Sequence, residues 1–157
     1  MRFLSLFFLL PLLACDRPAE APPPNVVLLL ADDLGYNDLS CYRALHPQPS
    51  EQPPTSETPH LDRLAGQGML FTNFYAGAAV CSPSRAALIT GRNATRTGIY
   101  NWIPGNSPMH LRDEEVTIAE LLQTRGYATG HFGKWHLGSP GTEQPLPNDQ
   151  GFDYSFY

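Results

Sequence analysis

Two short stretches of the chain carry side chains that could act together on an anion. Cys-Ser-Pro-Ser-Arg begins at Cys81 and ends at Arg85, and Lys-Trp-His begins at Lys134 and ends at His136. A cysteine thiol is a nucleophile or the precursor of one, arginine and lysine hold a positive charge, and histidine exchanges protons near neutral pH. Lys134 is the only lysine in the sequence, which argues against a general solubilising role. These residue types predict a site for an anionic substrate.

A pair of carboxylates, Asp32 and Asp33, directly follows an apolar stretch that ends at Ala31. Two adjacent like charges repel each other unless a cation holds them, and carboxylate oxygens are preferred ligands of Ca²⁺ and Mg²⁺. The alternative is a turn in which one of the two aspartates caps the following segment. We favour a divalent metal site at this pair.

Three segments have the composition of β-strands. Residues 25–31 contain the run Val-Val-Leu-Leu-Leu, which is typical of a parallel strand buried on both faces, so a central strand is predicted there. Residues 69–75 predict a second strand, and residues 127–132 a third that delivers Lys134 and His136 to its carboxyl end. Because side chains alternate along a strand, Lys134 and His136 are expected to point the same way.

A first helix is predicted to start near Thr58-Pro59 and to stop at Gly66 or Gly68. Proline is acceptable in the first turn of a helix, and glycine commonly follows the last turn. The apolar side chains expected to face the interior are Leu61, Leu64 and Ala65.

A later helix is marked by the capping box Thr-Ile-Ala-Glu, which runs from Thr117 to Glu120. Gly126 is predicted to close this helix. Its expected apolar stripe consists of Ile118, Leu121 and Leu122.

A helix is also predicted to begin at the first chemical stretch, with Ser82 as its cap, Pro83 in its first position and Gly91 as its left-handed terminator. This arrangement puts Cys81 at a helix N-terminus, where unpaired amides and the positive end of the helix dipole stabilise an anion. Arg85 follows one helical turn later, so its guanidinium can reach the same face as position 81.

The alternation of strands and helices predicts an α/β layered fold with its site at the carboxyl edge of the sheet. A composition of 42% hydrophobic and 16% charged residues indicates a globular protein rather than a disordered one. The net charge of −5 argues against nucleic acid as a partner, because phosphate contacts need clustered lysine and arginine.

Three stretches of the sequence resemble the signatures of the type I sulfatases, in the order and rough spacing of that family. Residues 79–91 resemble the first signature, residues 126–136 resemble the second, and the Asp-Asp-Leu-Gly-Tyr stretch from Asp32 resembles the start of the family's metal site. The resemblance implies the alkaline-phosphatase-like sandwich, a mostly parallel sheet between helices. It further implies that residues 25–157 are only the N-terminal portion of a truncated catalytic domain, which would be inactive in isolation.

The resemblance also implies a role for each chemical residue. A maturation enzyme would oxidise Cys81 to formylglycine, whose hydrated aldehyde attacks the sulfur of a sulfate ester. Arg85 and Lys134 would hold that hydrate and the sulfate oxygens, and His136 would bind the hydrate and substrate and assist its collapse. The modified Cys81, together with the two aspartates Asp32 and Asp33, would hold Ca²⁺, with Mg²⁺ as the alternative.

The N-terminus has the features of an export signal. Arg2 and the apolar stretch 3–13 form its charged and hydrophobic regions, and the stretch is shorter than the roughly 20 residues that span a membrane. Its ending, Leu-Leu-Ala-Cys at Cys15, resembles the lipobox of bacterial lipoproteins. We therefore predict a signal peptide at 1–14, a proline-rich tether at 15–24 and a lipid at Cys15. A plain signal peptide with an unmodified cysteine is the alternative.

The combined expectation is an exported, membrane-anchored sulfuric ester hydrolase of the bacterial periplasm or cell surface. Its substrate would be a sulfated small molecule or glycan, and its partners the maturation enzyme and the membrane. Two alternatives remain open at this point. One is a phosphonate or phosphodiester hydrolase that uses the same formylglycine, and the other is a non-catalytic lipoprotein that binds sulfated glycans.

Overall fold

The computed structural model describes residues 21–45, 57–138 and 144–157. The predicted signal peptide, Cys15 and the first part of the tether lie outside these residues. The chain divides into two units, Met1–Ala31 and Asp32–Tyr157. Each unit is described by itself.

The described part of the first unit, residues 21–31, forms neither helix nor strand. Its apolar side chains are exposed, with Leu29 82% accessible. The predicted central strand at 25–31 is therefore wrong for this structure. An apolar run encodes a preference for burial, but a strand exists only where a neighbouring strand hydrogen-bonds to it, and residues 21–31 have no such neighbour among the described residues.

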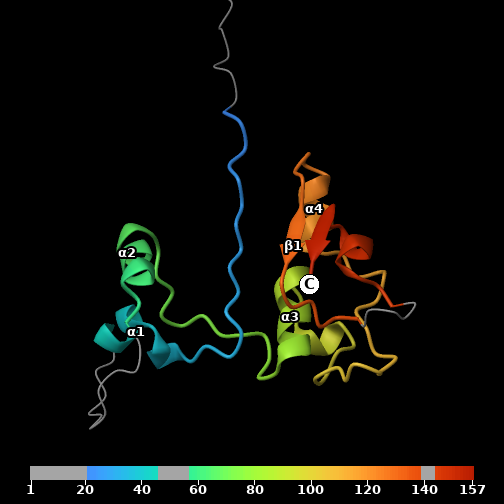
Figure 1. Cartoon of the computed structure of the whole chain (residues 1–157), viewed down its shortest axis with the longest axis horizontal. Helices are drawn as coiled ribbons and strands as arrows, with labels where there is room; N and C mark the ends of the chain where they lie inside the picture. The colour runs from blue at the N-terminus through green and yellow to red at the C-terminus, as the bar shows by residue number, and fades with distance from the viewer. Residues whose placement is uncertain (1–20, 46–56, 139–143) are drawn as a thin grey trace, which may run out of the picture. The chain divides into compact units, whose positions relative to one another are not determined.

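The second unit contains short helices and two strands (Figure 1). Its helices are α1 (Ser40–Leu45), α2 (Pro59–Gln67), α3 (Cys81–Thr90) and α4 (Ile118–Gln123), and its 3-10 turns are η1 (Tyr36–Asp38), η2 (Ala94–Arg96) and η3 (Pro147–Gln150). Its strands are β1 (Gly130–Phe132) and β2 (Tyr154–Phe156).

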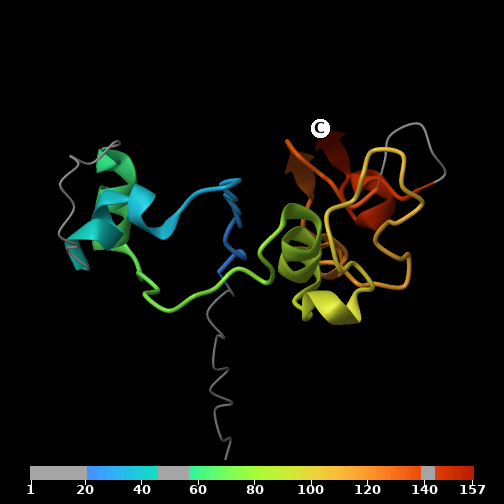
Figure 2. The same cartoon turned by 90° about the horizontal axis from the view of Figure 1, so that it is seen from below.

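The two strands pair in parallel, with Gly130 opposite Tyr154 and Phe132 opposite Phe156 (Figure 2). This parallel pairing beside helices confirms the predicted α/β class. The predicted strand at 127–132 is present but spans only β1. The predicted strand at 69–75 is wrong, because this segment has no regular structure.

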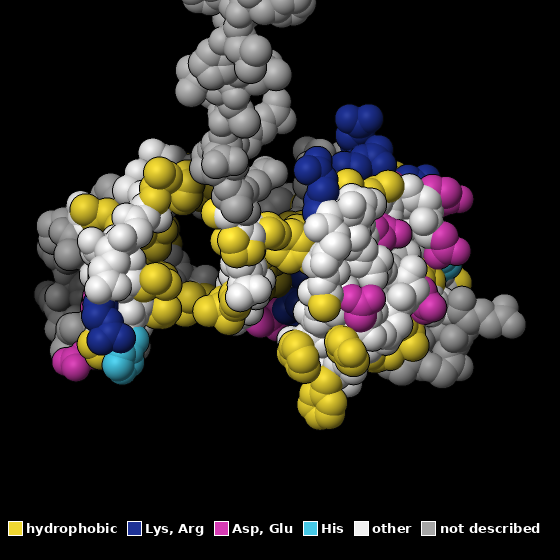
Figure 3. All heavy atoms as spheres, turned by 90° about the horizontal axis from the view of Figure 1, so that it is seen from above, with side chains coloured by type: hydrophobic (Ala, Val, Ile, Leu, Met, Phe, Trp, Pro, Cys, Tyr) yellow, Lys and Arg dark blue, Asp and Glu magenta, His cyan; other side chains and the backbone are white. Residues whose placement is uncertain are grey.

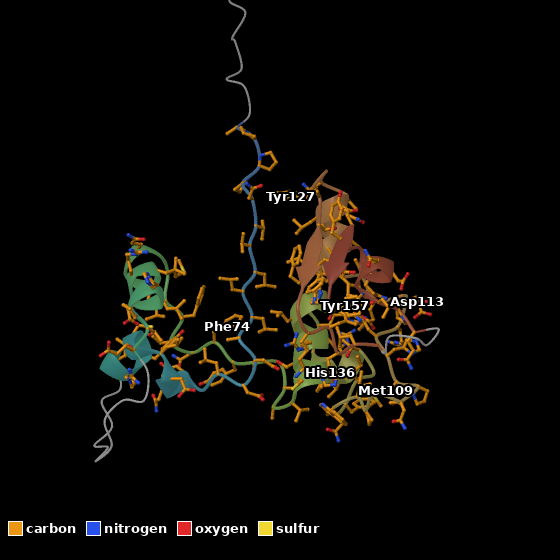
Figure 4. All side chains as sticks on the ribbon, viewed as in Figure 1. Phe74, Met109, Asp113, Tyr127, His136 and Tyr157 are labelled. Carbon is orange, nitrogen blue, oxygen red and sulfur yellow. The ribbon has the colours of Figure 1, made fainter. Side chains whose placement is uncertain are left out.

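The side chains of that segment lie in solvent instead of a core. Phe74 is 77% accessible and projects from the chain between α2 and α3 (Figure 4). Figure 3 shows further hydrophobic side chains at the surface of the described residues. Like the 25–31 run, this segment has β-forming residues without a strand to pair with.

The hydrophobic core lies in the C-terminal part of the second unit. Its buried members are Ala86, Ile99, Ile103, Leu111, Trp135 and Leu137, and Ile89 and Phe152 pack against them. Trp135, which lies between Lys134 and His136 in the sequence, is buried. The Leu111 amide donates a 2.8 Å hydrogen bond to the Leu137 carbonyl, which fastens the chain after Lys134 to the rest of the core.

Helix α3 forms where the sequence predicts a helix, but it starts slightly earlier. Val80 is its N-cap, so the predicted cap Ser82 and first position Pro83 are wrong by two residues. Pro83 is tolerated at the third position because first-turn amides have no intrahelical partner. The Ser82 hydroxyl accepts a 3.1 Å hydrogen bond from the Ile103 amide instead of capping the helix. Gly91 ends the helix in the predicted left-handed conformation, with φ of 64°.

Helix α2 follows Thr58 and is capped by Gly68, as predicted. Its apolar side chains were expected to face inward, but Leu61 and Leu64 are exposed, Leu64 by 61%. Hydrogen bonds join α2 and its N-cap to α1, because the Cys41 amide donates to Asp62 and the Ser40 amide donates to the Thr58 hydroxyl, each at 3.0 Å. A stripe of leucines is buried only where a second apolar surface covers it.

Helix α4 begins with the predicted capping box. The Glu120 amide donates to the Thr117 hydroxyl at 3.2 Å, and the Thr117 amide donates to the Glu120 carboxylate at 2.7 Å. Of the expected stripe, Ile118 and Leu121 are exposed, and Ala119 is the buried residue. Gly151, with φ of 85°, lies so close that an added Cβ would sit 2.6 Å from the Glu120 amide nitrogen.

The side chain of Asp153 joins the two strands and α4. It accepts hydrogen bonds of 2.8 Å from the Thr129 amide and 2.8 Å from the Gln123 side chain. The backbone and side chain of Thr129, followed by Gln123, hold the pKa of Asp153 below its ordinary value. This carboxylate therefore favours the folded state when it is ionised.

Asp153→Asn in the full-length protein should lower the melting temperature at neutral pH. It should also make the melting temperature fall less as the pH is lowered. A carboxylate with a lowered folded pKa contributes stability above its unfolded pKa of about 3.9, and that contribution is lost as the pH falls through the folded pKa. Melting curves from pH 7 to pH 3 should therefore converge for the two proteins. Asp113→Asn, at the exposed position labelled in Figure 4, is the matched control. Parallel curves for wild type and Asp153→Asn would contradict this assignment.

Candidate active site

Three segments of the second unit meet at the N-terminus of α3. The Lys134 ammonium group donates a 2.7 Å hydrogen bond to Asp32 Oδ2 and a 3.3 Å bond to Cys81 Sγ. Arg85 donates to Asp32 Oδ1 at 3.3 Å and to the backbone carbonyl of Lys134. The structure thus brings together the acidic pair, the first residues of α3 and the segment after β1.

The charges in this cluster reinforce one another. The hydrogen bond from Lys134 lowers the pKa of Asp32, Arg85 lowers it further, and partial loss of hydration opposes both. The hydrogen bond that Lys134 donates to Asp32 in turn raises the pKa of Lys134, with a smaller contribution from Cys81. Both groups are therefore charged at neutral pH.

The position of Cys81 combines a helix terminus with two cationic groups. Cys81 is the first residue of α3, so its amide and that of Ser82 have no partner within the helix. Arg85, one turn later, lies on the same side, because both residues contact Lys134. The Nε atom of Arg85 is buried and has no hydrogen-bond partner among the described residues. An oxyanion at position 81 would meet the helix dipole and both cations.

Asp32, Asp33 and Cys81 form the group of potential metal ligands. One ligand atom from each residue lies within 4.8 Å of the others. Asp33 has a positive φ of 56°, a conformation that aspartate adopts more readily than most residues. Two carboxylates suit a hard ion such as Ca²⁺ or Mg²⁺, whereas a thiol does not. If an oxygen replaced the Cys81 sulfur, all three residues would offer oxygen ligands, which a hard ion prefers.

His136 lies beside this cluster but contacts different partners. Its Nε2 is 2.9 Å from the Ile103 carbonyl, so Nε2 carries the hydrogen, because a carbonyl oxygen only accepts. Nδ1 is buried and has no partner among the described residues. β1 ends at Phe132 and His136 has a φ of 61°, so the alternation expected for Lys134 and His136 does not apply. Figure 4 labels His136 among the side chains of this unit.

The sequence assigned no functional role to two neighbours of the cluster, Trp102 and His131. Trp102 packs edge-on against His136, with ring centroids 5.5 Å apart. His131 packs edge-on against Trp135 and Phe152. Burial, and then the charge of Arg85, lower the pKa of His131, which makes it a neutral packing residue at physiological pH. Their places depend on contacts between distant segments, which spacing along the chain does not encode.

Comparison with known proteins shows the family of the chain. The sulfatase family model matches residues 24–157, and the chain belongs to the sulfatase family. It is 51% identical over 138 residues to human arylsulfatase A, covering 85% of this chain and 25% of that protein. It is 44% identical over 149 residues to an N-acetylgalactosamine-6-O-sulfatase of Bacteroides thetaiotaomicron, covering 90% of this chain and 27% of the relative.

Solved structures agree with the sequence relatives. The protein Ps i-CgsB superposes with a TM-score of 0.71 at 38% identity over 85% of this chain and 28% of its own. The PsFucS1 sulfatase from Pseudoalteromonas sp. superposes with a TM-score of 0.63 at 36% identity over 80% of this chain and 24% of its own. These similarities confirm the predicted alkaline-phosphatase-like fold class and the sulfatase resemblance. The chain spans about a quarter of the length of these relatives.

The match to the sulfatase family model begins at residue 24. Within the part of the chain that the structure describes, no helix combines the length and the apolarity needed to cross a membrane. The signal peptide, the lipid at Cys15 and the domain boundaries remain predictions from the sequence.

Proposed function

We propose that the full-length protein hydrolyses sulfate monoesters at the site around Cys81. The observation that carries this proposal is the contact of Lys134 with both Asp32 and Cys81 at the N-terminus of α3. It joins a candidate nucleophile, a fixed positive charge and a candidate metal ligand within hydrogen-bond distance. The sulfatases among the relatives support sulfate as the transferred group.

Arg85 and Lys134 would bind the three peripheral oxygens of the sulfate group. Both side chains already converge beside Cys81, so little reorganisation is needed when charge builds up on those oxygens. The raised pKa of Lys134 keeps its ammonium group charged throughout the physiological range. Formylglycine made from Cys81 by a maturation enzyme would supply the hydrated aldehyde that accepts the sulfuryl group.

His136 would move the proton of that hydrate. The hydrogen bond between Nε2 and the Ile103 carbonyl fixes the tautomer and leaves the Nδ1 lone pair free. A histidine held in one orientation through its other nitrogen is the usual arrangement of a general base.

Asp32 and Asp33 would hold Ca²⁺, with Mg²⁺ as the alternative. A divalent ion supplies charge that polarises the bound sulfate. The need for it follows from a charge count, because Arg85 and Lys134 both pair with Asp32, and Asp33 adds a second negative charge. Without a further cation, the cluster has no net positive charge for an anionic ester.

The N-terminal residues would place this site outside the cytoplasm. In our proposal, residues 1–14 direct export, Cys15 carries a lipid, and residues 15–24 act as an extended proline-rich spacer. The enzyme would then meet a sulfated small molecule or glycan in the periplasm or at the cell surface.

Side-by-side rates on an aryl sulfate and an aryl phosphonate test the proposed reaction. The full-length protein, produced together with a formylglycine-generating enzyme, should turn over the sulfate faster than the phosphonate. Chelation should abolish the activity and Ca²⁺ should restore it. Asp32→Asn should lower the Ca²⁺ affinity about tenfold or more in a calorimetric titration, because it removes a charged ligand.

The matched control is Asp38→Asn, on the 3-10 turn that follows the acidic pair. This variant should bind Ca²⁺ as wild type does. Faster turnover of the phosphonate would favour the phosphonate hydrolase. Tight binding of a sulfated glycan without any turnover would favour the non-catalytic lipoprotein.

A further inference from the structure

The segment that follows η2 presents Trp102 beside the proposed site. Of the two tryptophans in the chain, Trp135 is buried in the core, whereas Trp102 is 51% accessible. The indole of Trp102 stands at 76° to the ring of His136, with a centroid distance of 5.5 Å. Its Nε1 has no hydrogen-bond partner among the described residues.

The backbone of Ile103, next to Trp102, is hydrogen-bonded to the α3 segment and to His136. The Ile103 amide donates a 3.1 Å hydrogen bond to the hydroxyl of Ser82, the residue after Cys81. The Ile103 carbonyl accepts the 2.9 Å hydrogen bond from His136 Nε2. Ile103 itself is buried in the core. These contacts fix where Trp102 stands relative to position 81 and to His136.

The local turn also restricts Trp102. Its amide donates a 2.8 Å hydrogen bond to the Asn101 side chain. The indole is thus held in place beside His136 and leaves about half of its surface available to a bound molecule. Tyr100, two residues earlier and 69% accessible, has no recorded contact with His136.

We infer that Trp102 is a specificity-determining residue that packs against the leaving group of the substrate. The inference rests on the proposed sulfatase function, because it concerns the leaving group of a sulfate ester bound at that site. A flat indole beside the site favours a leaving group with an apolar ring face, such as an aryl ring or a sugar ring, over an acyclic alkyl group. The free Nε1–H can in addition donate to a ring hydroxyl.

Kinetics of the full-length enzyme with three substrates test this assignment. Trp102→Ala should raise KM about tenfold for an aryl sulfate and for a monosaccharide sulfate, and change KM for an acyclic alkyl sulfate by less than about twofold. Trp102→Phe should recover most of the loss on the aryl sulfate. Tyr100→Ala, the matched control in the same loop, should behave as wild type. Comparing the KM changes for the aryl sulfate and the monosaccharide sulfate shows which ring Trp102 prefers.

A purely supporting role for Trp102 predicts a different result. If the indole only positions His136, Trp102→Ala should reduce kcat equally on all three substrates and shift the pH profile of kcat. That pattern, or an unchanged KM for both ring substrates, would overturn the inference.

Equilibrium binding separates this inference from the proposed function. In the Cys81→Ser variant, which lacks the cysteine for maturation, titration with a monosaccharide sulfate should quench tryptophan fluorescence. The additional Trp102→Phe substitution should remove that quenching and weaken binding several-fold. If this holds while the wild type shows no turnover, the proposed function fails and the role of Trp102 stands. If the Trp102→Phe substitution changes neither signal nor affinity, the inference fails whatever the activity.

Discussion

Cys81→Ala in the full-length protein should reduce turnover of sulfate esters by at least about a thousandfold. The aldehyde would form at Cβ of this residue with loss of the thiol sulfur, and alanine has no thiol on which the maturation enzyme can act. The fold should be retained, because position 81 is the first residue of α3 and alanine is a strong helix former. Circular dichroism and steady-state kinetics on an aryl sulfate measure the two effects separately.

Cys81→Ser distinguishes a hydrated aldehyde from a simple hydroxyl nucleophile. Serine keeps an oxygen beside Lys134, so a plain alkoxide mechanism predicts substantial residual activity. With a maturation enzyme specific for cysteine, we expect the serine variant to be as inactive as the alanine variant.

Mass spectrometry of the wild-type peptide containing Cys81 completes this test. The active enzyme should show a peptide that has lost one sulfur and two hydrogens and gained one oxygen at that residue, which distinguishes an aldehyde from a hydroxyl. An active preparation in which the thiol is intact would contradict the assignment.

Glu115→Ala should lower the free energy of unfolding of this unit by about 2–3 kcal/mol. The Glu115 carboxylate is buried and accepts hydrogen bonds from Arg92 at 2.6 Å and Arg112 at 2.7 Å. Removing a buried partner of two arginines leaves their charges uncompensated. The expected loss is smaller than the roughly 3–5 kcal/mol typical of breaking a fully buried ion pair, because both guanidinium groups are partly exposed.

The pH dependence of this effect follows from the state of the carboxyl group. Burial alone would raise the pKa of Glu115, but hydrogen bonds from Arg112 and Arg92 outweigh it and leave the pKa below its ordinary value. The stabilising contribution is therefore complete above the unfolded pKa of about 4.3 and is lost as the pH falls through the folded pKa. Urea unfolding at pH 7 and in acid should show wild type and Glu115→Ala converging at low pH.

The neighbouring Glu114 supplies the control for this prediction. Glu114 is exposed, and Glu114→Ala should leave the urea midpoint nearly unchanged. In the double variant Arg92→Ala with Glu115→Ala, the loss should be smaller than the sum of the two single losses, because both single changes break the same ion pair. Strict additivity would show that the pair does not stabilise the fold.

Short-range features of the fold were predictable from the sequence. The capping box at Thr117 and Glu120, the start of α2 after Thr58, and the left-handed Gly91 each depend on contacts within a few residues. The strands were less predictable. Residues 25–31 and 69–75 have β-forming composition, yet pairing requires a partner segment far along the chain, and β1 pairs with β2 across more than twenty residues.

Some features of the candidate site were likewise predictable from the sequence, whereas others were not. The sequence alone indicated the chemistry, because a single lysine, a cysteine before proline and arginine, and adjacent aspartates are types suited to an anion and a hard metal ion. It also indicated the family, which the comparisons confirm. It could not indicate that Lys134 lies between Asp32 and Cys81, or that Arg85 bonds the Lys134 backbone.

Residue types and their order are local properties, so the sequence by itself determined the family, the α/β class, the capping box of α4 and the chemical groups available to the site. The tertiary structure alone decided that His136 bonds Ile103, that Trp102 stands beside it, and that Glu115 is buried between two arginines. These contacts join segments that are separated in sequence, and they form only when packing of the shared core brings those segments together.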